Sequence, residues 1–192
     1  MRIIAGKFGS RRLRAGRGIF LRPTSDRLRE TLFDILQSRV DGSFFVDGYA
    51  GTGAVGIEAL SRGARRVVFL ENHRAALAVI RENLRALGVS DGVEIVPGDL
   101  CRSLAALAAR GEPADILFFD PPYAETEEYT RVLEALAGSA LVYPDTGRAG
   151  PDSLVVFERA RKTVLPAAHG PFIRTRTVIQ GDAALDFFTR AQ

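Results

Sequence analysis

The chain is poor in the residues on which several classes of protein depend. It has one cysteine, Cys101, among 192 residues, so no disulfide can form within the chain. Its two histidines, His73 and His169, stand too far apart for any recognised zinc-binding spacing. No apolar run approaches the roughly 18 residues of a membrane-spanning helix, and none of signal-peptide type follows the basic N-terminus. These absences predict a protein of the reducing cytoplasm, without metal or membrane contact.

Lysine is scarce as well, because only Lys7 and Lys162 interrupt a set of 26 basic residues that is otherwise arginine. The net charge of +3 is unevenly distributed: residues 1–30 carry nine basic and two acidic side chains, or +7, so the remaining chain carries −4. A surface that binds a polyanion is therefore expected at the N-terminus.

The first part of the chain predicts a small basic β/α extension. Short β-prone runs occupy residues 2–8 and 12–21. Thr24 or Ser25 then caps a helix whose apolar residues recur at i, i+4, i+7 and i+8 from Leu28.

From residue 44 onward, strand and helix patterns alternate. Strands are expected at residues 44–47, 66–71, 93–96, 115–120 and 154–158, and helices at 54–62, 74–87, after Asp99 and at 126–137. Two final β-rich runs, 173–179 and 184–189, predict an antiparallel hairpin. Regular alternation is typical of a doubly wound, mostly parallel α/β sheet. We therefore divide the chain into an extension, residues 1–40, and an α/β domain, residues 41–192.

A glycine-rich turn, Asp47–Gly53, follows the first strand of this domain and forms a G-x-G-x-x-G pattern with Gly56. Its glycines permit positive φ and let a ligand approach the backbone closely. Ligands of open α/β sheets bind at this carboxyl edge. Glu71 ends the next strand, where a carboxylate can accept hydrogen bonds from ribose hydroxyls. The turn therefore predicts a nucleotide-cofactor site.

Acidic residues distinguish between the possible cofactors. A dinucleotide places its pyrophosphate at this turn, where Asp47 would repel it, whereas the cationic amino-acid end of S-adenosylmethionine would be attracted. Asp99 follows the third strand and could accept from the adenine amine, although it also suits the N-cap of a helix that begins at Leu100. Acids at three successive strand ends thus match the three polar parts of S-adenosylmethionine.

The tetrapeptide Asp120-Pro121-Pro122-Tyr123 ends the fourth strand. The carboxylate of Asp120 and the carbonyl of Pro121 can accept both hydrogens of a base amine and turn its nitrogen toward a methyl donor. Consecutive prolines stiffen the loop, and Tyr123 offers a flat face to an unstacked base. Catalysis would then come largely from positioning and desolvation. We assign Asp120, Pro121 and Tyr123 to this amine clamp, although a Pro-Pro turn that closes a strand would look the same.

These segments resemble the RsmD-type family of small-subunit ribosomal RNA guanine-N2 methyltransferases over nearly the full chain. The resemblance rests on Met1–Phe8, Arg22–Glu30 with Leu32-Phe33, Asp47–Gly53 with Glu58–Ala64, and Asp120–Tyr123. It implies a seven-stranded, Rossmann-like class I methyltransferase sheet with an antiparallel end. The target it implies is a guanine of 16S ribosomal RNA, within the small ribosomal subunit. Gly48, where family members usually carry an apolar side chain, and a long loop before Leu154 depart from the pattern.

Two sets of binding residues are expected. The S-adenosylmethionine site comprises Asp47, Ala50, Gly51, Gly53, Glu71, Asn72, Asp99 and Leu100. The RNA-binding set comprises Arg11, Arg12, Arg14 and Arg17 on phosphates and Arg22, Arg27 and Arg29 near the mouth of the site. Phosphate contacts give salt-sensitive affinity with little sequence preference. We expect the protein to act as a monomer.

Four alternatives stay open. The clamp does not distinguish bases, so the target could be an adenine N6 in DNA or RNA. The glycine pattern alone would also suit an NAD-dependent oxidoreductase, against which Asp47 argues. A non-catalytic RNA-binding assembly factor would not need Asp120, and a small-molecule methyltransferase would not need the basic N-terminus.

Overall fold

The computed structural model describes residues 1–15, 25–143 and 153–191. Their contacts divide the chain into two compact units, Met1–Leu100 and Cys101–Gln192, and each is described by itself. None of the helices in the described ranges is both long and apolar enough to cross a membrane.

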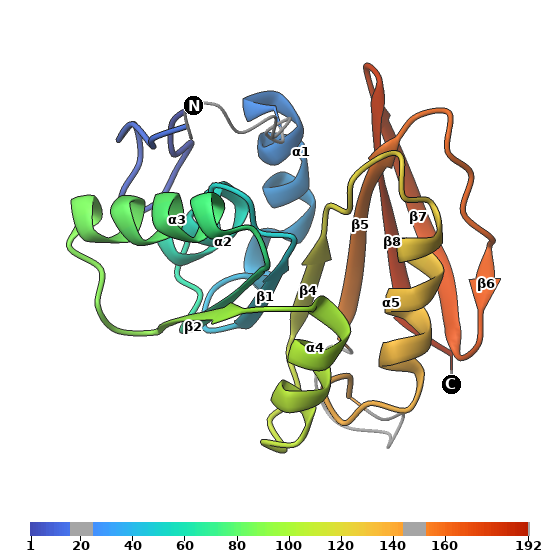
Figure 1. The fold of residues 1–192 in the computed structure, drawn as a ribbon. Helices are drawn as coiled ribbons and strands as arrows, with labels where there is room; N and C mark the ends of the chain where they lie inside the picture. The colour runs from blue at the N-terminus through green and yellow to red at the C-terminus, as the bar shows by residue number, and fades with distance from the viewer. Residues whose placement is uncertain (16–24, 144–152, 192) are drawn as a thin grey trace. The chain divides into compact units, whose positions relative to one another are not determined.

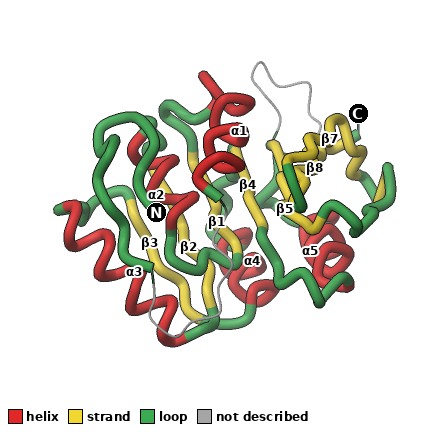
Figure 2. The backbone as a smooth tube through the Cα atoms, turned by 90° about the horizontal axis from the view of Figure 1, so that it is seen from above, coloured by secondary structure: helices red, strands yellow, loops and turns green. Residues whose placement is uncertain are grey.

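Three parallel strands form the centre of the first unit, in the order β3-β2-β1. They are β1 (Phe44–Gly48), β2 (Arg66–Glu71) and β3 (Val93–Pro97), and Figures 1 and 2 show them side by side. Asp47 lies opposite Phe69 and Glu71 opposite Pro97, so the carboxyl ends of the three strands meet at one edge. Every residue of β1 is buried, as expected of a strand covered on both faces.

Helices follow the strands as their caps and apolar spacing predict. Ser25 caps α1 (Asp26–Leu36), and its side-chain oxygen accepts a hydrogen bond from the Leu28 N–H at 3.1 Å. A short 3-10 helix, η1 (Gln37–Arg39), follows it. α2 (Ala54–Ser61) and α3 (Arg74–Leu87) complete the unit, and α3 ends at Gly88, whose φ of 70° is the left-handed conformation of a helix C-cap. The predicted helices at 54–62 and 74–87 are confirmed.

The N-terminal segment forms less sheet than predicted. Its described residues contain one isolated antiparallel bridge, between Arg2 and Arg12, in place of the strand predicted at 2–8. The backbone N–H groups bond instead to α2: those of Ile4 and Ala5 donate to the Glu58 carboxylate at 2.7 and 3.0 Å. The segment is therefore packed into the first unit and is not a separate appendage.

The second unit combines parallel and antiparallel strands with two helices, the first of which, α4, begins at the last residue of the first unit. Its elements are α4 (Leu100–Ala108), β4 (Ile116–Phe119), α5 (Glu127–Ala137), β5 (Leu154–Ala160), β6 (Ala168–His169), β7 (Phe172–Gln180) and β8 (Ala183–Arg190). The strand order is β4-β5-β8-β7-β6, in which β4 and β5 are parallel and every later pair is antiparallel. The C-terminal hairpin is thus confirmed. Strands number eight in the described residues, not the predicted seven, because the two-residue β6 adds an edge.

Candidate functional site

Asp47 lies at the end of β1 and is almost fully buried, with 2% of its surface exposed. Its Oδ2 accepts a hydrogen bond from the Gly56 N–H at 2.8 Å, which ties the strand to the first turn of α2. A Cβ at Gly56 would lie 2.4 Å from the Phe69 ring and 2.9 Å from Val67. The third glycine of the pattern therefore allows α2 to pack closely on β2 and to meet the carboxylate.

The buried position of Asp47 changes its ionisation. Burial raises the pKa of Asp47 to about 8, the hydrogen bond from Gly56 opposes that rise, and the nearby charge of Glu71 adds to it. A carboxyl group in this state becomes ionised most readily when a cation lies beside it. The site therefore suits a ligand with a cationic group, such as the amino-acid end of S-adenosylmethionine.

The glycine-rich turn adopts the conformation that its composition predicts. Gly51 and Gly53 have φ values of 55° and 75°, and Tyr49 has a φ of 58°, which is uncommon for a residue with a side chain. The turn is closed by the Gly53 N–H, which donates to the Ala50 carbonyl at 2.7 Å. Such a turn leaves its backbone open to a bound ligand.

Glu71 links this turn to the ends of β2 and β3. Its Oε2 accepts from the Gly51 N–H at 2.7 Å, and its Oε1 accepts from the N–H groups of Asn72 and His73 at 2.9 and 2.8 Å. Its carbonyl accepts from the Gly98 N–H at 3.1 Å, which brings the half-buried Asp99 to the same edge. These bonds fix the Glu71 carboxylate at the carboxyl edge of the strands, and its contact with ribose hydroxyls stays a prediction.

The structure thus brings the predicted cofactor residues together at one edge of the first unit. Ala50 and Leu100 are buried beside the turn and at the start of α4, and Asn72 is exposed. This edge carries three carboxylates, those of Asp47, Glu71 and Asp99. They are the groups that an ammonium group, ribose hydroxyls and an adenine amine require, so the residues fit S-adenosylmethionine.

The amine clamp begins directly after β4. Asp120 is half-buried, Pro121 is buried and Pro122 is exposed. The Pro122 carbonyl accepts from the Glu125 N–H at 2.8 Å, so the loop turns at once toward α5. The Tyr123 hydroxyl donates to Glu158 Oε1 at 3.1 Å. The clamp therefore has a fixed backbone and a tethered aromatic ring.

Glu158 is a site residue that the sequence interpretation missed. It lies on β5 with 4% of its surface exposed, and the register of Phe119 with Phe157 places it beside Asp120. A signal was present, because Val-Val-Phe-Glu repeats the apolar-then-acid ending of the strands that carry Asp47 and Asp120.

Tyr129 was also missed. It lies on α5, 1% exposed, and its ring meets that of Phe157 edge-on at 5.7 Å between centroids. Its hydroxyl has no hydrogen-bond partner in the described part of the chain. Burial, together with the charge of Asp120, raises the pKa of Tyr129, so this hydroxyl stays neutral beneath the clamp.

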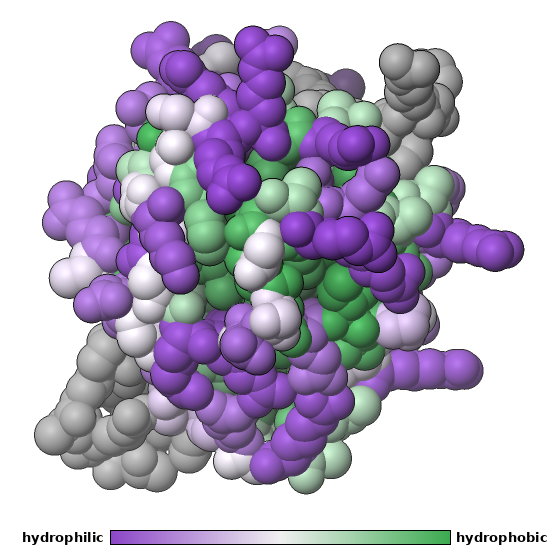
Figure 3. Space-filling view, turned by 90° about the vertical axis from the view of Figure 1, so that its left-hand side faces the viewer, coloured by the Kyte–Doolittle hydropathy of each residue, from purple (hydrophilic) through white to green (hydrophobic). Residues whose placement is uncertain are grey.

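The predicted RNA-binding arginines have different environments. Arg11, Arg12 and Arg14 are exposed; Arg11 donates to the Ala86 carbonyl at 3.1 Å and Arg14 to Glu82 at 2.9 Å. Figure 3, which views the side of the N-terminal segment and α3, shows hydrophilic side chains spread over this face. Arg14 is therefore ion-paired with Glu82, and contacts of these three arginines with a phosphate backbone stay a prediction. Arg17 and Arg22 lie outside the described residues.

Arg29 must be removed from the RNA-binding set, because its side chain is fully buried. Its Nη2 donates to the Arg2 carbonyl and, at 3.0 Å, to Asp26. Its Nε lies 3.8 Å from the buried Glu58 carboxylate. The guanidinium holds the N-terminal segment against α1 and α2, and this role in tertiary structure explains its burial.

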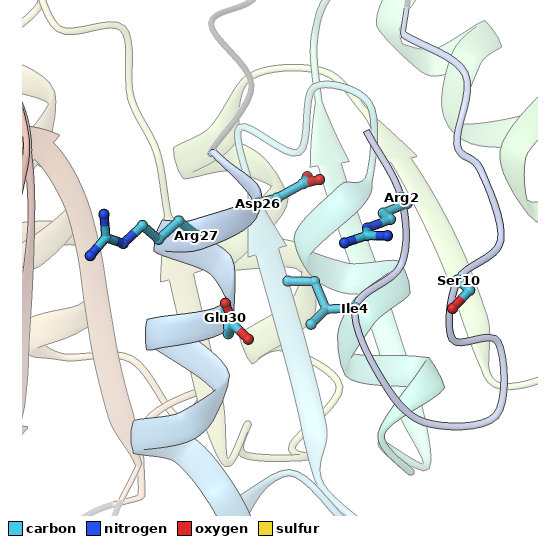
Figure 4. Close-up of a pocket in the computed structure, with 6 residues that line it drawn as sticks. All are labelled: Arg2, Ile4, Ser10, Asp26, Arg27 and Glu30. Atoms are coloured by element: carbon cyan, nitrogen blue, oxygen red, sulfur yellow. The ribbon is translucent and has the colours of Figure 1, made fainter.

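A pocket of about 470 Å³ lies between the N-terminal segment and α1, and none of its lining residues belongs to the glycine-rich turn. It is lined by Arg2, Ile4, Ser10, Asp26, Arg27 and Glu30. Figure 4 shows Asp26 pointing toward Arg2 and Arg27 pointing away from it. Both signs of charge line the pocket, so it does not resemble an anion site. Arg27 is exposed, and its contact with RNA stays a prediction.

The fold and the two sets of site residues define a class I methyltransferase. A family model described as "Conserved hypothetical protein 95" matches residues 1–189, and the chain belongs to this family of RsmD-type methyltransferases. It is 32% identical to the "Putative rRNA methyltransferase YlbH" of Bacillus subtilis, over 94% of both chains. It is 31% identical to the "Ribosomal RNA small subunit methyltransferase D" of Escherichia coli K12, over 99% of this chain and 90% of that one.

Solved structures agree with this assignment of the fold. A putative methyltransferase of Escherichia coli, yhhF, has a TM-score of 0.75 at 31% identity and covers 100% of this chain, with 98% of its own chain matched. A hypothetical protein of Thermus thermophilus has a TM-score of 0.79 at 30% identity, over 97% of this chain and 98% of its own. The class I methyltransferase sheet predicted from the sequence is therefore confirmed, with eight strands in the described residues where seven were predicted.

Proposed function

We propose that this protein transfers a methyl group from S-adenosylmethionine to the exocyclic N2 amine of a guanine in small-subunit ribosomal RNA. The observation that carries the proposal is the Asp-Pro-Pro-Tyr clamp, with its ring tethered to Glu158, in a chain that also holds the buried Asp47 at a glycine-rich turn. The name of the Escherichia coli relative, a ribosomal RNA small subunit methyltransferase, supports the substrate.

S-adenosylmethionine supplies an electrophilic methyl carbon on a sulfonium. Asp47 would hold the ammonium group, Glu71 the ribose hydroxyls and Asp99 the adenine amine. The first unit thus positions the methyl donor, and its N-terminal arginines supply contacts to the RNA phosphates.

The clamp prepares the acceptor. The Asp120 carboxylate and the Pro121 carbonyl accept the two amine hydrogens, so the nitrogen lone pair is turned out of the ring toward the methyl carbon. With S-adenosylmethionine bound, the new N–C bond would form as the C–S bond breaks, and the electron pair of the C–S bond would pass to sulfur. The methylated nitrogen would then lose one proton, for which we propose Asp120 as the acceptor. Holding the amine in this geometry supplies most of the rate.

The test is methyl transfer from radiolabelled S-adenosylmethionine to small ribosomal subunits from cells that lack the protein. Wild type and Asp120→Ala are compared, and the labelled nucleoside is identified by mass. N2-methylguanosine formed only by the wild type supports the proposal. N6-methyladenosine would overturn guanine as the target base but leave the role of the amine clamp standing. If neither subunits nor naked RNA were labelled, both the target base and the role of the clamp would be overturned.

A further inference from the structure

A second basic region lies at the C-terminal end of the chain. Residues 159–192 carry six basic and two acidic side chains, or +4, whereas residues 31–158 carry −8. Two neighbouring members, Arg161 and Lys162, are exposed directly after β5, and Arg159 before them is 5% exposed. This region plays no part in the proposed cofactor site or clamp.

The buried Arg159 holds in place the turn that carries the exposed Arg161 and Lys162. Arg159 pairs with Asp186, with Nε–Oδ2 and Nη2–Oδ1 distances of 2.5 and 3.2 Å. Its Nη1 donates to the carbonyls of Ala160, Arg161 and Thr163 at 3.3, 3.3 and 2.6 Å. One guanidinium therefore fixes three successive parts of the turn that carries Arg161 and Lys162.

A second arginine fixes the other end of the same loop. Arg174 on β7 donates from Nη1 to the Leu165 carbonyl at 2.8 Å and lies 3.6 Å from the same Asp186 carboxylate. Its backbone N–H donates to the Ala167 carbonyl at 2.8 Å. Asp186 is fully buried, so its charge is compensated by both arginines, as a buried carboxylate requires. We call residues 161–167 the basic loop.

The basic loop presents charge that no described part of the protein neutralises. In the described ranges the side chains of Arg161 and Lys162 form no ion pair, and Val164 beside them is 83% exposed. The Arg161 N–H donates to the Asp182 carbonyl at 2.8 Å, which joins the loop to the turn of the β7–β8 hairpin. Figure 1 shows this hairpin projecting at one end of the second unit.

The amine clamp lies at the same end of the second unit as the basic loop, because the clamp follows β4, the basic loop follows β5, and these two strands are parallel. β5 continues for three residues beyond Phe157, the residue in register with the last residue of β4, Phe119. The basic loop therefore begins three residues after Glu158, which holds Tyr123. Phosphates that flank a base held in the clamp would lie within reach of long basic side chains at this edge.

We infer that the basic loop is a second contact surface for the phosphate backbone of the RNA substrate, separate from the N-terminal arginines. The inference rests on the proposed function, because it takes RNA as the partner. Arg161 and Lys162 bind phosphates, and Val164 contacts the sugar-base surface between them. The buried Arg159, Arg174 and Asp186 hold the loop in place before RNA arrives, which lowers the entropy cost of ordering it.

The experiment compares Arg161→Ala/Lys162→Ala with Arg85→Ala/Arg110→Ala. The control pair removes two exposed arginines outside the basic loop, Arg85 in the last turn of α3 and Arg110 between α4 and β4. Methylation of small subunits is measured across a salt series, with S-adenosylmethionine affinity measured alongside. We expect the first variant to raise KM for subunits roughly tenfold, and its log KM to depend on log salt concentration less steeply by about 1.4, since each lost phosphate contact removes about 0.7.

The kcat, the S-adenosylmethionine affinity and the control variant are expected to match wild type. Charge-conserving Arg161→Lys/Lys162→Arg is expected to restore KM. Wild-type KM and salt slope in the first variant, or equal losses in the control, would overturn the inference. If wild type methylates no subunits, the proposed function fails; the same variants are then compared for direct binding to radiolabelled 16S ribosomal RNA, where equal affinity overturns the contact surface independently.

Discussion

The Tyr123 hydroxyl donates a hydrogen bond to Glu158 Oε1 at 3.1 Å, across the gap between the clamp and the neighbouring strand. Tyr123 is half-buried and Glu158 is 4% exposed, so the bond holds the ring of a partly solvated residue on a fixed acceptor. We therefore expect Glu158 to be a positioning residue, which would act on the base through Tyr123.

This bond predicts a graded series of activities. Tyr123→Phe keeps the aromatic face but loses the tether, and Glu158→Ala removes the acceptor. Because a hydrogen bond to a charged group is worth about 1.5–3 kcal/mol, each is expected to lower kcat/KM for RNA about tenfold or more. Glu158→Gln keeps an acceptor oxygen and is expected to recover most of the activity. Steady-state kinetics decide this, with S-adenosylmethionine affinity unchanged throughout. A Glu158→Gln variant as weak as Glu158→Ala would count against the positioning role.

Binding of S-adenosylmethionine is expected to depend on pH through Asp47. Its pKa of about 8 in the unliganded protein means that the carboxyl group is mostly protonated at pH 7. A cationic ligand binds the ionised form, so affinity rises with pH by up to about tenfold per unit and levels off above pH 8. Calorimetry between pH 6 and 9 measures this and the proton released on binding. The Asp47→Asn variant should bind weakly, with a nearly flat profile over the same range.

The same group affects stability in the opposite direction. The folded pKa of Asp47 lies above the ordinary value of 3.8, so between about pH 4 and 8 the unfolded chain binds fewer protons than the native one. Without ligand, the free energy of unfolding contributed by Asp47 therefore decreases as pH rises through this window. Urea unfolding at pH 5 and pH 8 tests this. If the wild type loses no more stability than Asp47→Asn between these values, the native carboxyl group is not held protonated.

Local signals in the sequence were sufficient for the elements that position the cofactor. The apolar spacing of α3 and the glycine after it predicted the bounds Arg74–Leu87, and the strand from residue 66 to 71 was likewise recovered. In both cases the information lies within a few residues, as periodicity and a terminating cap. The carboxyl edge that gathers Asp47 and Glu71 follows from these elements alone.

Long-range contacts were not predictable in the same way. Arg29 occupies a helix position that a solvated arginine could also take, and only its bonds to Arg2 and Asp26 and its proximity to Glu58 show why it is buried. Residues 2–8 have β propensity, but Glu58 offers their N–H groups a carboxylate in place of a partner strand. Propensity describes a segment alone, and here distant residues decide its conformation.

Gly56 is expected to tolerate no side chain. In Gly56→Ala the new Cβ would lie 2.4 Å from the Phe69 ring and 2.9 Å from Val67, so α2 or β2 must move. Overpacking of this kind costs about 1–3 kcal/mol, and movement of α2 also weakens the Gly56–Asp47 bond, so S-adenosylmethionine affinity should fall too. Gly138→Ala is the control, since nothing lies within 4 Å of its added Cβ. Thermal unfolding measures both variants, and equal midpoints would contradict the close packing described for α2.

Arg27 and Arg29 lie two residues apart in α1, and their alanine substitutions are expected to have opposite effects on stability and on KM for RNA. Arg29→Ala removes one partner of a buried ion pair with Glu58 and leaves the Arg2 carbonyl without its donor, so we expect a loss of about 3–5 kcal/mol of unfolding free energy. Arg27 is exposed, so Arg27→Ala should leave stability within about 0.5 kcal/mol and raise KM for RNA severalfold, less so at high salt.

Denaturant unfolding and the salt dependence of KM separate these two residues. Limited proteolysis adds a third measurement, because release of the N-terminal segment from α2 should make it sensitive to protease in Arg29→Ala alone. The opposite pattern, with a stable Arg29→Ala whose KM rises, would show that the guanidinium faces RNA after all. Glu58→Gln separates the contribution of the Arg29–Glu58 ion pair to stability from that of side-chain packing, because it keeps the shape of the side chain and removes its charge. It should therefore destabilise the protein in the same direction as Arg29→Ala.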